Sequence, residues 1–255
     1  MGKVSIQRKN EGNVEVCGGM TRYVLLDGVV DDVVITKCVL KAGEKWTPDI
    51  YAYGEKVQWF FFTTASGYVA TPSIAHNITD KAIYVPDFDR EEFYIQAGAD
   101  DLEFLHVVGK MNEIDLEMMN ECHIVLPRFR LLKDSWRYTE GFTGDAGSNV
   151  KSHMVIEHEY FGRYSMGWNC GVGPTFIGEH IHPDLEQWYY ALDDSSFTYT
   201  AGDSEFKVNG GDITHTPEKT PHGSKSEDGE DINYIWIELA TKGYMPIGYF
   251  RSIDD

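Results

Sequence analysis

The chain has 255 residues, which is enough for one large domain or two small ones with a buried core. Its 41 Asp and Glu residues outnumber its 22 Lys and Arg residues and give a formal net charge of −19. This balance argues against nucleic acid or an anionic membrane as a partner, because both bind to basic surfaces. No segment reaches the ~18 consecutive apolar residues of a membrane span, and residues 1–16 lack the apolar core of a secretory signal. We therefore expect a cytoplasmic protein whose four scattered cysteines are reduced.

Short runs of β-branched and aromatic residues recur along the chain, and Gly, Pro, Asp or Asn separates most of them. In chain order they cover residues 14–18, 32–40, 58–65, 81–86, 103–108, 154–161, 186–192, 196–202 and 232–239. The clearest helical stretch, residues 113–121, has good helix formers but only about two turns. The pattern predicts an all-β sandwich or barrel with a short helical connector.

The sequence also contains an internal repeat. Residues 51–61 align with residues 180–190, and two further segments align downstream in the same order. The matched pairs, at offsets of 129 to 131 residues, are Gln58 with Gln187, Trp59 with Trp188, Pro86 with Pro217, and Asp101 with Asp231. The nearly constant offset predicts two copies of one β-unit. We place an N-terminal domain at residues 1–110, a connector with a short helix and a loop at 111–150, and a C-terminal domain at 151–255.

The second copy begins with a candidate metal site. His180 and His182 are two residues apart, so in a strand both side chains point to the same side. Pro183 predicts a turn after them, and an antiparallel strand that starts at Glu186 can return its carboxylate to the same pocket. Imidazole and carboxylate groups suit first-row divalent metals such as Mn, Fe, Co, Ni and Zn. Taken alone, these three residues fit the polar face of a surface strand equally well.

A fourth group lies downstream, where Gly211, Pro217 and His222 follow one another with five residues between the glycine and the proline. With the HxHxxxE pattern upstream, this stretch resembles the two motifs of the cupin superfamily. Three positions depart from the motifs, with Asp193 and Lys219 in place of glycines and Ser226 in place of an asparagine. The resemblance implies a double-stranded β-helix, or jelly roll. It also implies one divalent metal ion bound inside the barrel by His180, His182, Glu186 and His222.

The first copy lacks these groups. In the same alignment its ligand positions are occupied by Tyr51, Tyr53, Val57 and Glu91. Tyrosine is a poor ligand for most of these metals, and valine cannot bind one. We therefore predict an all-β protein of two tandem cupin barrels with a short helical connector, in which only the C-terminal barrel binds metal. The N-terminal barrel is expected to have a supporting, dimer-forming or lid role, so a homodimer is one candidate assembly.

Three residues near the predicted ligands are candidates for further roles. The side chain of His215 faces either the site, as a base or fifth ligand, or outward. Trp188 and Tyr190 share the face of Glu186 by the two-residue period of a strand, so they form either pocket walls or plain barrel core. We take His215 and Tyr190 as candidate catalytic residues and Trp188 as a candidate substrate-binding residue.

The segment from residue 153 to residue 169 supplies two more candidates. It is expected to form strands that enter the second barrel. His153 and Arg163, like His158, reach either the cavity or the surface, and the surface is the better interpretation. We retain His153 and Arg163 as candidate substrate-binding residues.

Three histidines and one carboxylate leave about two positions of an octahedral ion open to substrate oxygens. The resemblance implies chemistry that ranges from oxalate degradation and dioxygenation to isomerisation, lysis, hydrolysis and binding without turnover. We expect a metal-dependent enzyme that acts on a small oxygenated metabolite by redox-neutral isomerase, lyase or hydrolase chemistry, with general acid–base help from a nearby His, Tyr or Glu. The alternatives are an iron-dependent dioxygenase and a non-catalytic binding or sensing protein.

Overall fold

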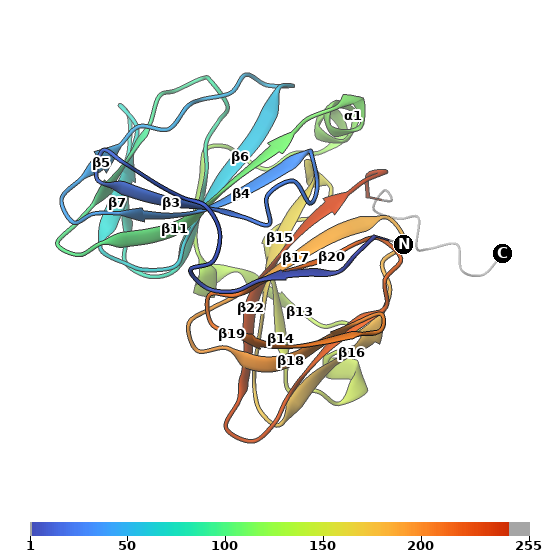
Figure 1. Ribbon diagram of the computed structural model, residues 1–255. Coiled ribbons are helices and arrows are strands. Elements are labelled where there is room, and N and C mark those ends of the chain that lie inside the picture. Colours follow the sequence, from blue (N-terminus) through green and yellow to red (C-terminus); the bar gives the residue numbers. More distant parts are fainter. Residues whose placement is uncertain (1, 245–255) are drawn as a thin grey trace.

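A computed structural model describes residues 2–244, and its secondary structure is mostly β, as the sequence predicts (Figure 1). One large sheet contains, in spatial order, β12 (Arg128–Leu131), β9 (Ala82–Val85), β6 (Lys56–Phe62), β11 (Leu102–Lys110), β4 (Val33–Leu40), β3 (Met20–Leu25) and β2 (Val14–Cys17). A small sheet packs against it and contains β5 (Lys45–Trp46), β10 (Tyr94–Ala97), β7 (Gly67–Ala70) and β8 (Ala75–Ile78). We call this pair of sheets the N-terminal sandwich.

A second pair of sheets repeats this arrangement. Its large sheet contains β1 (Ser5–Gln7), β20 (Ile213–Thr216), β17 (Leu185–Ala191), β22 (Asp231–Ala240), β15 (Tyr160–Val172), β14 (Lys151–Ile156) and β13 (Trp136–Tyr138). Its small sheet contains β16 (Thr175–His180), β21 (His222–Ser226), β18 (Ser196–Ala201) and β19 (Ser204–Asn209). We call this pair the C-terminal sandwich.

The matched segments of the internal repeat occupy corresponding strands. β6 lies between β9 and β11, and β17 lies between β20 and β22, with antiparallel pairing in both cases. The strand at one end of each large sheet is not contiguous in sequence with the rest of that sheet. β1 comes from the start of the chain but pairs with β20, whereas β12 follows the first unit and the helix and pairs with β9. In Figure 1 the blue strand β1 lies along β20, beside the strands drawn in orange and red. The pairing of β1 with β20 links the start of the chain to the C-terminal sandwich through backbone hydrogen bonds.

The apolar side chains form three clusters. One fills the N-terminal sandwich, one lies in the C-terminal sandwich, and the third lies between the two large sheets. The sequence of β6 is apolar from residue 59 to residue 62 because both faces of the strand are buried there. Phe60 and Phe62 point into their own sandwich, and Trp59 and Phe61 point toward the other large sheet. Both faces of each large sheet are therefore buried over its central strands.

The predicted helix is present as α1 (Glu113–Glu121). Its N-terminus is capped by Asn112, whose side chain accepts hydrogen bonds from the backbone N–H groups of Ile114 and Asp115. Asp115 also accepts from the Nε of Arg163 in β15 at 3.0 Å, and both side chains are buried. This ion pair fixes the helix to the C-terminal sandwich. Two short 3₁₀ turns, η1 (Leu132–Asp134) and η2 (Gly144–Ala146), belong to the connector.

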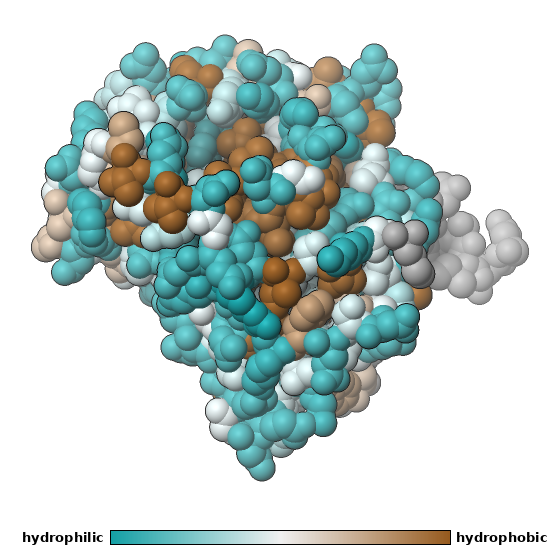
Figure 2. Space-filling model, viewed as in Figure 1, coloured by the Kyte–Doolittle hydropathy of each residue, from teal (hydrophilic) through white to brown (hydrophobic). Residues whose placement is uncertain are grey.

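The visible surface is mainly polar. Figure 2 shows a gathering of apolar residues near the middle of this face, over the region of β4 and β6 in Figure 1, while most of the remaining face is hydrophilic. Within residues 2–244, no helix is long and apolar enough to cross a membrane.

Candidate metal centre

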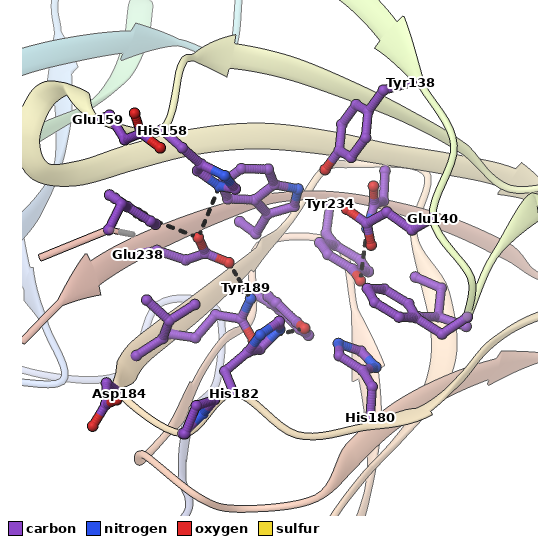
Figure 3. A pocket seen from close by; sticks show the side chains of 18 of the residues that line it. Tyr138, Glu140, His158, Glu159, His180, His182, Asp184, Tyr189, Tyr234 and Glu238 are labelled. Atoms are coloured by element: carbon purple, nitrogen blue, oxygen red, sulfur yellow. Dashed lines mark hydrogen bonds and ion pairs between the residues drawn. The ribbon is translucent and has the colours of Figure 1, made fainter. Parts of the chain in front are cut away.

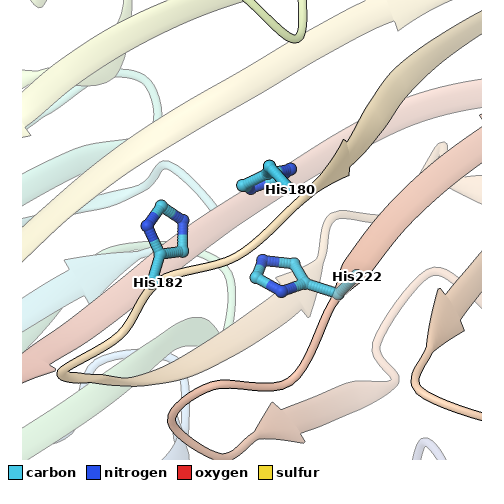
Figure 4. A group of neighbouring side chains, drawn as sticks. All are labelled: His180, His182 and His222. Atoms are coloured by element: carbon cyan, nitrogen blue, oxygen red, sulfur yellow. The ribbon is translucent and has the colours of Figure 1, made fainter.

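Three of the four predicted ligands lie together in the C-terminal sandwich (Figure 4). His180 is the last residue of β16, His182 follows in the turn toward β17, and His222 is the first residue of β21. β16 and β21 pair with His180 opposite His222, so the sheet register brings the two segments together. One ring nitrogen from each histidine lies within 4.8 Å of the others. Among the described residues, this is the one group of three or more potential metal-ligating side chains.

Backbone contacts orient two of these rings. The Nδ1 of His180 lies 2.8 Å from the carbonyl oxygen of Gly178, and the Nδ1 of His222 lies 2.9 Å from that of Thr220. A carbonyl oxygen only accepts, so each Nδ1 donates its proton and each Nε2 keeps a lone pair. The Nε2 of His222 is buried and has no hydrogen-bond partner within the described part of the chain. An unpaired buried acceptor beside two further imidazoles fits a divalent cation.

Burial keeps these histidines uncharged. It lowers the pKa of His180 to about 4 and the pKa of His222 to about 3, and it lowers the pKa of His182 as well. At neutral pH all three rings are therefore in the neutral form, which is the form that ligates a metal.

Phe142, in the connector, covers one side of the group. Its ring is stacked on that of His180, with 3.7 Å between the centroids and 2° between the planes. The carbonyl oxygen of Phe142 also accepts a hydrogen bond from the N–H of Gly178 at 2.7 Å. The connector therefore takes part in positioning the first histidine.

A cavity of about 280 Å³ opens beside the histidines (Figure 3). This volume is about nine times the ~30 Å³ that one water molecule occupies in the liquid, so the cavity has room for a small metabolite. Its walls come from β22, β17, the connector and the end of the described chain. The polar and aromatic lining residues include Tyr138, Glu140, Phe142, His158, Asn169, Gln187, Tyr189, Tyr234, Trp236, Glu238 and Tyr244.

Glu238 of β22 is a buried carboxylate in one wall of this cavity. Its Oε1 accepts from the Nε2 of Gln187 at 2.7 Å, and its Oε2 accepts from the hydroxyls of Ser165 and Tyr244 at 3.1 and 3.2 Å. The Nε2 of His158 lies 3.3 Å from the same Oε2. Burial raises the pKa of Glu238, but the neighbouring His158 and His182 and the hydrogen bond from Gln187 outweigh it and hold the pKa at about 2. Glu238 is therefore ionised at neutral pH.

Glu140 lies across the cavity from Glu238, on the connector (Figure 3). Burial raises the pKa of Glu140; a hydrogen bond with Tyr138 opposes this shift, and the charge of Glu238 adds to it. The pKa of Tyr138 is also raised, mainly by burial. The pKa values of Glu140 and Glu238 are thus shifted in opposite directions.

Glu186 does not join the histidines, so its prediction as a fourth ligand is corrected. Successive side chains of β17 point to opposite faces of the sheet. Gln187 and Tyr189 face the cavity, whereas the carboxylate of Glu186 contacts the Nε2 of His215 at 2.7 Å. The inward position of this strand is therefore one residue later than the sequence predicts. Gln187 occupies it, and its amide is already bonded to Glu238 and Tyr189.

His215, Trp188 and Tyr190 are also placed away from the cavity. Trp188 and Tyr190 belong to the cluster between the two large sheets and are buried. His215 stands opposite Trp188 in the sheet register, and the centroids of their rings are 5.1 Å apart. His215 and Tyr190, the candidate catalytic residues, and Trp188, the candidate substrate-binding residue, therefore do not lie among the residues that line the cavity.

Neither His153 nor Arg163 lines the cavity. His153 is half-buried and stacks on Trp168 at 4.6 Å. Arg163 is 3% exposed and pairs with Asp115, and it also donates to the carbonyl oxygen of Lys110 at 3.1 Å. Both are corrected to structural residues. Of the three candidates His153, His158 and Arg163, His158 lines the cavity, contrary to the surface position that the sequence favours.

Sequence reasoning missed Glu238 and Glu140. Glu238 is the one charged residue in the mostly apolar run 232–239, and a single charge in such a strand is a usable signal. Gln187 was noted only as a match of the internal repeat. Glu140 lies in the connector, where nothing in the local pattern indicates that the chain turns back over the second sandwich.

The N-terminal sandwich has the same sheets but a filled interior. Its core contains Phe60, Phe62, Tyr84, Phe93 and Phe104. His106 stacks on Phe60, with 4.6 Å between centroids, and its Nε2 bonds to the Oε1 of Gln58 at 3.0 Å. Val57 is 1% exposed and faces the other large sheet, as its counterpart Glu186 does. The two central strands thus keep the same register in both sandwiches.

No protein-family profile and no curated protein sequence matches the chain. Solved structures do resemble it. Oxalate decarboxylase of Lactobacillus farciminis in a formate complex has a TM-score of 0.68 and 12% identity, with 92% of this chain and 86% of that one covered. Protein Ylba from E. coli has a TM-score of 0.73 and 9% identity, with 96% and 94% covered.

A putative glyoxylate-induced protein from Pseudomonas aeruginosa has a TM-score of 0.69 and 11% identity, with 92% of this chain and 85% of that one covered. These structural neighbours are cupin proteins. The likeness shows that this chain has the cupin fold, and at such low identity it shows the fold alone.

Proposed function

We propose that the protein is a divalent-metal-dependent enzyme that acts on a small oxygenated metabolite in the C-terminal sandwich. We further propose that each sandwich is one cupin barrel and that the N-terminal barrel supports the other. The observation that carries the proposal is the group of three neutral histidines, with the unpaired Nε2 of His222, at the edge of a cavity. When bound there, an ion such as Mn, Fe, Co, Ni or Zn supplies a Lewis acid that polarises a substrate oxygen.

The chain prepares the histidines for this role. The backbone carbonyls of Gly178 and Thr220 fix the protonated nitrogen of His180 and His222, so that each Nε2 stays available. The ring of Phe142 keeps His180 in place and covers that side of the group. Little reorganisation is then needed when a cation arrives.

The cavity also holds groups that can handle a proton. Glu140, whose pKa is raised by burial, lies at the cavity where it can exchange a proton with a bound molecule. Glu238 remains ionised within its network and supplies a fixed negative charge on the other wall. Two carboxyl groups with pKa values shifted apart are typical of acid–base chemistry. This arrangement supports redox-neutral isomerase, lyase or hydrolase chemistry.

The proposal is tested in two steps. Purified protein should contain about one divalent ion per chain by elemental analysis, or take one up on titration. The loaded protein is then incubated with pooled hydroxy acids, amino acids and sugars, and turnover is followed by NMR. We expect turnover that Glu140→Gln reduces at least tenfold without loss of metal. Protein that binds no divalent ion even at saturating concentration would refute the proposal.

A further inference from the structure

The walls of the cavity contain more negative than positive groups. Among the lining residues that the structure describes, none is lysine or arginine. Burial keeps His180 and His182 neutral, and any charge on His158 is paired with Glu238 at 3.3 Å. Asp184, at the cavity edge, forms an ion pair with Lys242 at 2.5 Å. The described lining of the cavity therefore offers no free cation to an anionic group.

Glu140 is the carboxyl group that lacks such a counter-charge. It forms no ion pair with any described residue, and it faces the cavity. Burial, the largest effect, raises its pKa, although a hydrogen bond with Tyr138 and the charge of His158 lower it. A positive group beside it would supply the missing compensation.

A second, independent feature is an unpaired acceptor in the same cavity. Asn169 of β15 lines the cavity and is 6% exposed. Its Nδ2 donates to the hydroxyl of Tyr234 at 3.2 Å, which leaves Oδ1 to accept. This buried Oδ1 has no hydrogen-bond partner among the described residues. Buried acceptors without a partner are rare in folded proteins, and a donor on a ligand satisfies them.

The remaining walls are aromatic. Six aromatic residues line the cavity, namely Tyr138, Phe142, Tyr189, Tyr234, Trp236 and Tyr244. The faces of such rings attract cations, and the attraction increases where water is excluded. Aromatic faces together with a carboxylate and an amide oxygen are a suitable environment for an ammonium or guanidinium group.

From these features we infer that the cavity binds a small molecule with a cationic, hydrogen-donating nitrogen at one end, such as an amino or guanidino compound. The nitrogen lies near Glu140 and the Oδ1 of Asn169, among the aromatic rings. The placement of an oxygen donor at the other end, toward the three histidines, rests on the proposed function. A second carboxylate in place of the nitrogen faces the carboxylate of Glu140 and the Oδ1 of Asn169, so a dicarboxylate is a poor ligand for this cavity.

Three probes that differ at one end only test this inference: 4-aminobutanoate, butanoate and glutarate. Their binding is measured by isothermal titration calorimetry with Zn²⁺-loaded protein and again with metal-free protein. We expect 4-aminobutanoate to bind the loaded protein about tenfold or more tightly than butanoate, and glutarate to bind most weakly. The preference for the amine should persist, at lower affinity, without metal.

Variants identify the group that recognises the nitrogen. Glu140→Gln should reduce the preference for 4-aminobutanoate over butanoate about tenfold while Zn²⁺ uptake is unchanged. Glu179→Gln is the matched control, because Glu179 is exposed on β16 beside the histidines but does not line the cavity. It removes the same charge nearby and should leave the preference intact.

Glutarate binding as tightly as 4-aminobutanoate, or equal effects of the two variants, would overturn the inference. Binding of none of the probes to either form would also overturn it for ligands of this size. Failure of Zn²⁺ to bind would instead contradict the proposed function, while the amine preference of the metal-free protein would still be measured.

Discussion

The two sandwiches have the same strand order but different interiors. At the corresponding positions of the central strands, Phe60 stands opposite His106 in the first, and Tyr189 stands opposite Trp236 in the second. In the first the aromatic rings close the interior, whereas in the second a cavity remains beside three histidines. Gln58 and Gln187 keep the same inward position in both. The sheets are thus a common frame, and the chemistry depends on a few inward positions and on the turn that carries His182.

The largest effect is expected from the histidines themselves. Replacing His222 by alanine removes one of three ligands and should abolish stoichiometric metal binding, from about one ion per chain to nearly none. His153→Ala is the matched control, because His153 is a half-buried histidine outside the group. Elemental analysis of both variants checks the result. Retention of the metal by His222→Ala would show that the centre lies elsewhere.

Replacing one phenylalanine in each sandwich compares the stability contributed by the filled interior with that contributed by the interior that holds the cavity. Phe60→Ala removes a fully buried ring from the N-terminal core and should reduce the free energy of unfolding by about 3–5 kcal/mol. Phe142→Ala removes a half-buried ring at the cavity and should cost clearly less. Urea unfolding measures both. Equal losses would indicate that the two interiors are packed alike.

Metal removal should destabilise the folded protein. At a hundredfold excess of free ion over Kd, binding to the native state adds about 2.7 kcal/mol. A chelator should therefore lower the Tm of the wild type by several degrees and leave the Tm of His222→Ala unchanged. Differential scanning calorimetry provides the comparison. An equal decrease in both proteins would mean that the chelator acts at another site.

Acid should destabilise both sandwiches of the metal-free protein. The folded pKa values of His106, His180 and His222 are about 3, 4 and 3, below the ordinary value of 6.5. Below pH 6.5 the unfolded chain therefore binds protons that the folded chain does not, and stability falls as the pH falls. Each group should contribute a loss of about 1.4 kcal/mol between pH 7.5 and 5.5. Urea titrations at the two pH values check this, and a pH-independent midpoint would contradict it.

The smallest effect is expected at Glu186. Its carboxylate contacts His215 on the face away from the histidines, so Glu186→Gln should keep about one ion per chain. The expected cost in stability is about 1 kcal/mol, from a weakened buried hydrogen bond. Elemental analysis of the Glu186→Gln variant measures how many ions it retains per chain. Loss of the ion in Glu186→Gln, to the extent expected for His222→Ala, would restore the glutamate as a ligand.

The sequence predicts most of the strands and the helix, because the patterns that indicate them are local or periodic. The runs of apolar residues, the helix at residues 113–121 and the repeat around Gln58 and Gln187 all correspond to elements of the structure. The spacing of His180 and His182, with His222 after the glycine turn, also predicts which imidazoles meet. These features depend on neighbours in sequence or on a strong motif.

The missed features depend on a choice of face and on contacts distant in the chain. The two-residue period correctly groups Glu186 with Trp188, but it cannot say which face of the sheet is inward. The residue of β17 that faces the cavity is one position later than predicted. The carboxylate of Glu186 therefore lies on the opposite face of the sheet, and Gln187 lies at the cavity. Glu140 reaches the cavity only because the connector folds back over it, which no local pattern encodes.

The central claim is that the two sandwiches share one frame and differ in a single three-histidine metal centre. A crystal structure of the protein loaded with Zn²⁺, with anomalous scattering measured at the metal edge, tests it most directly. We predict one ion per chain, about 2.0–2.1 Å from a nitrogen of each of His180, His182 and His222, with Glu186 still bonded to His215 and no ion in the N-terminal sandwich. An ion bound through Glu186, or none at the three histidines at saturating Zn²⁺, would contradict the account.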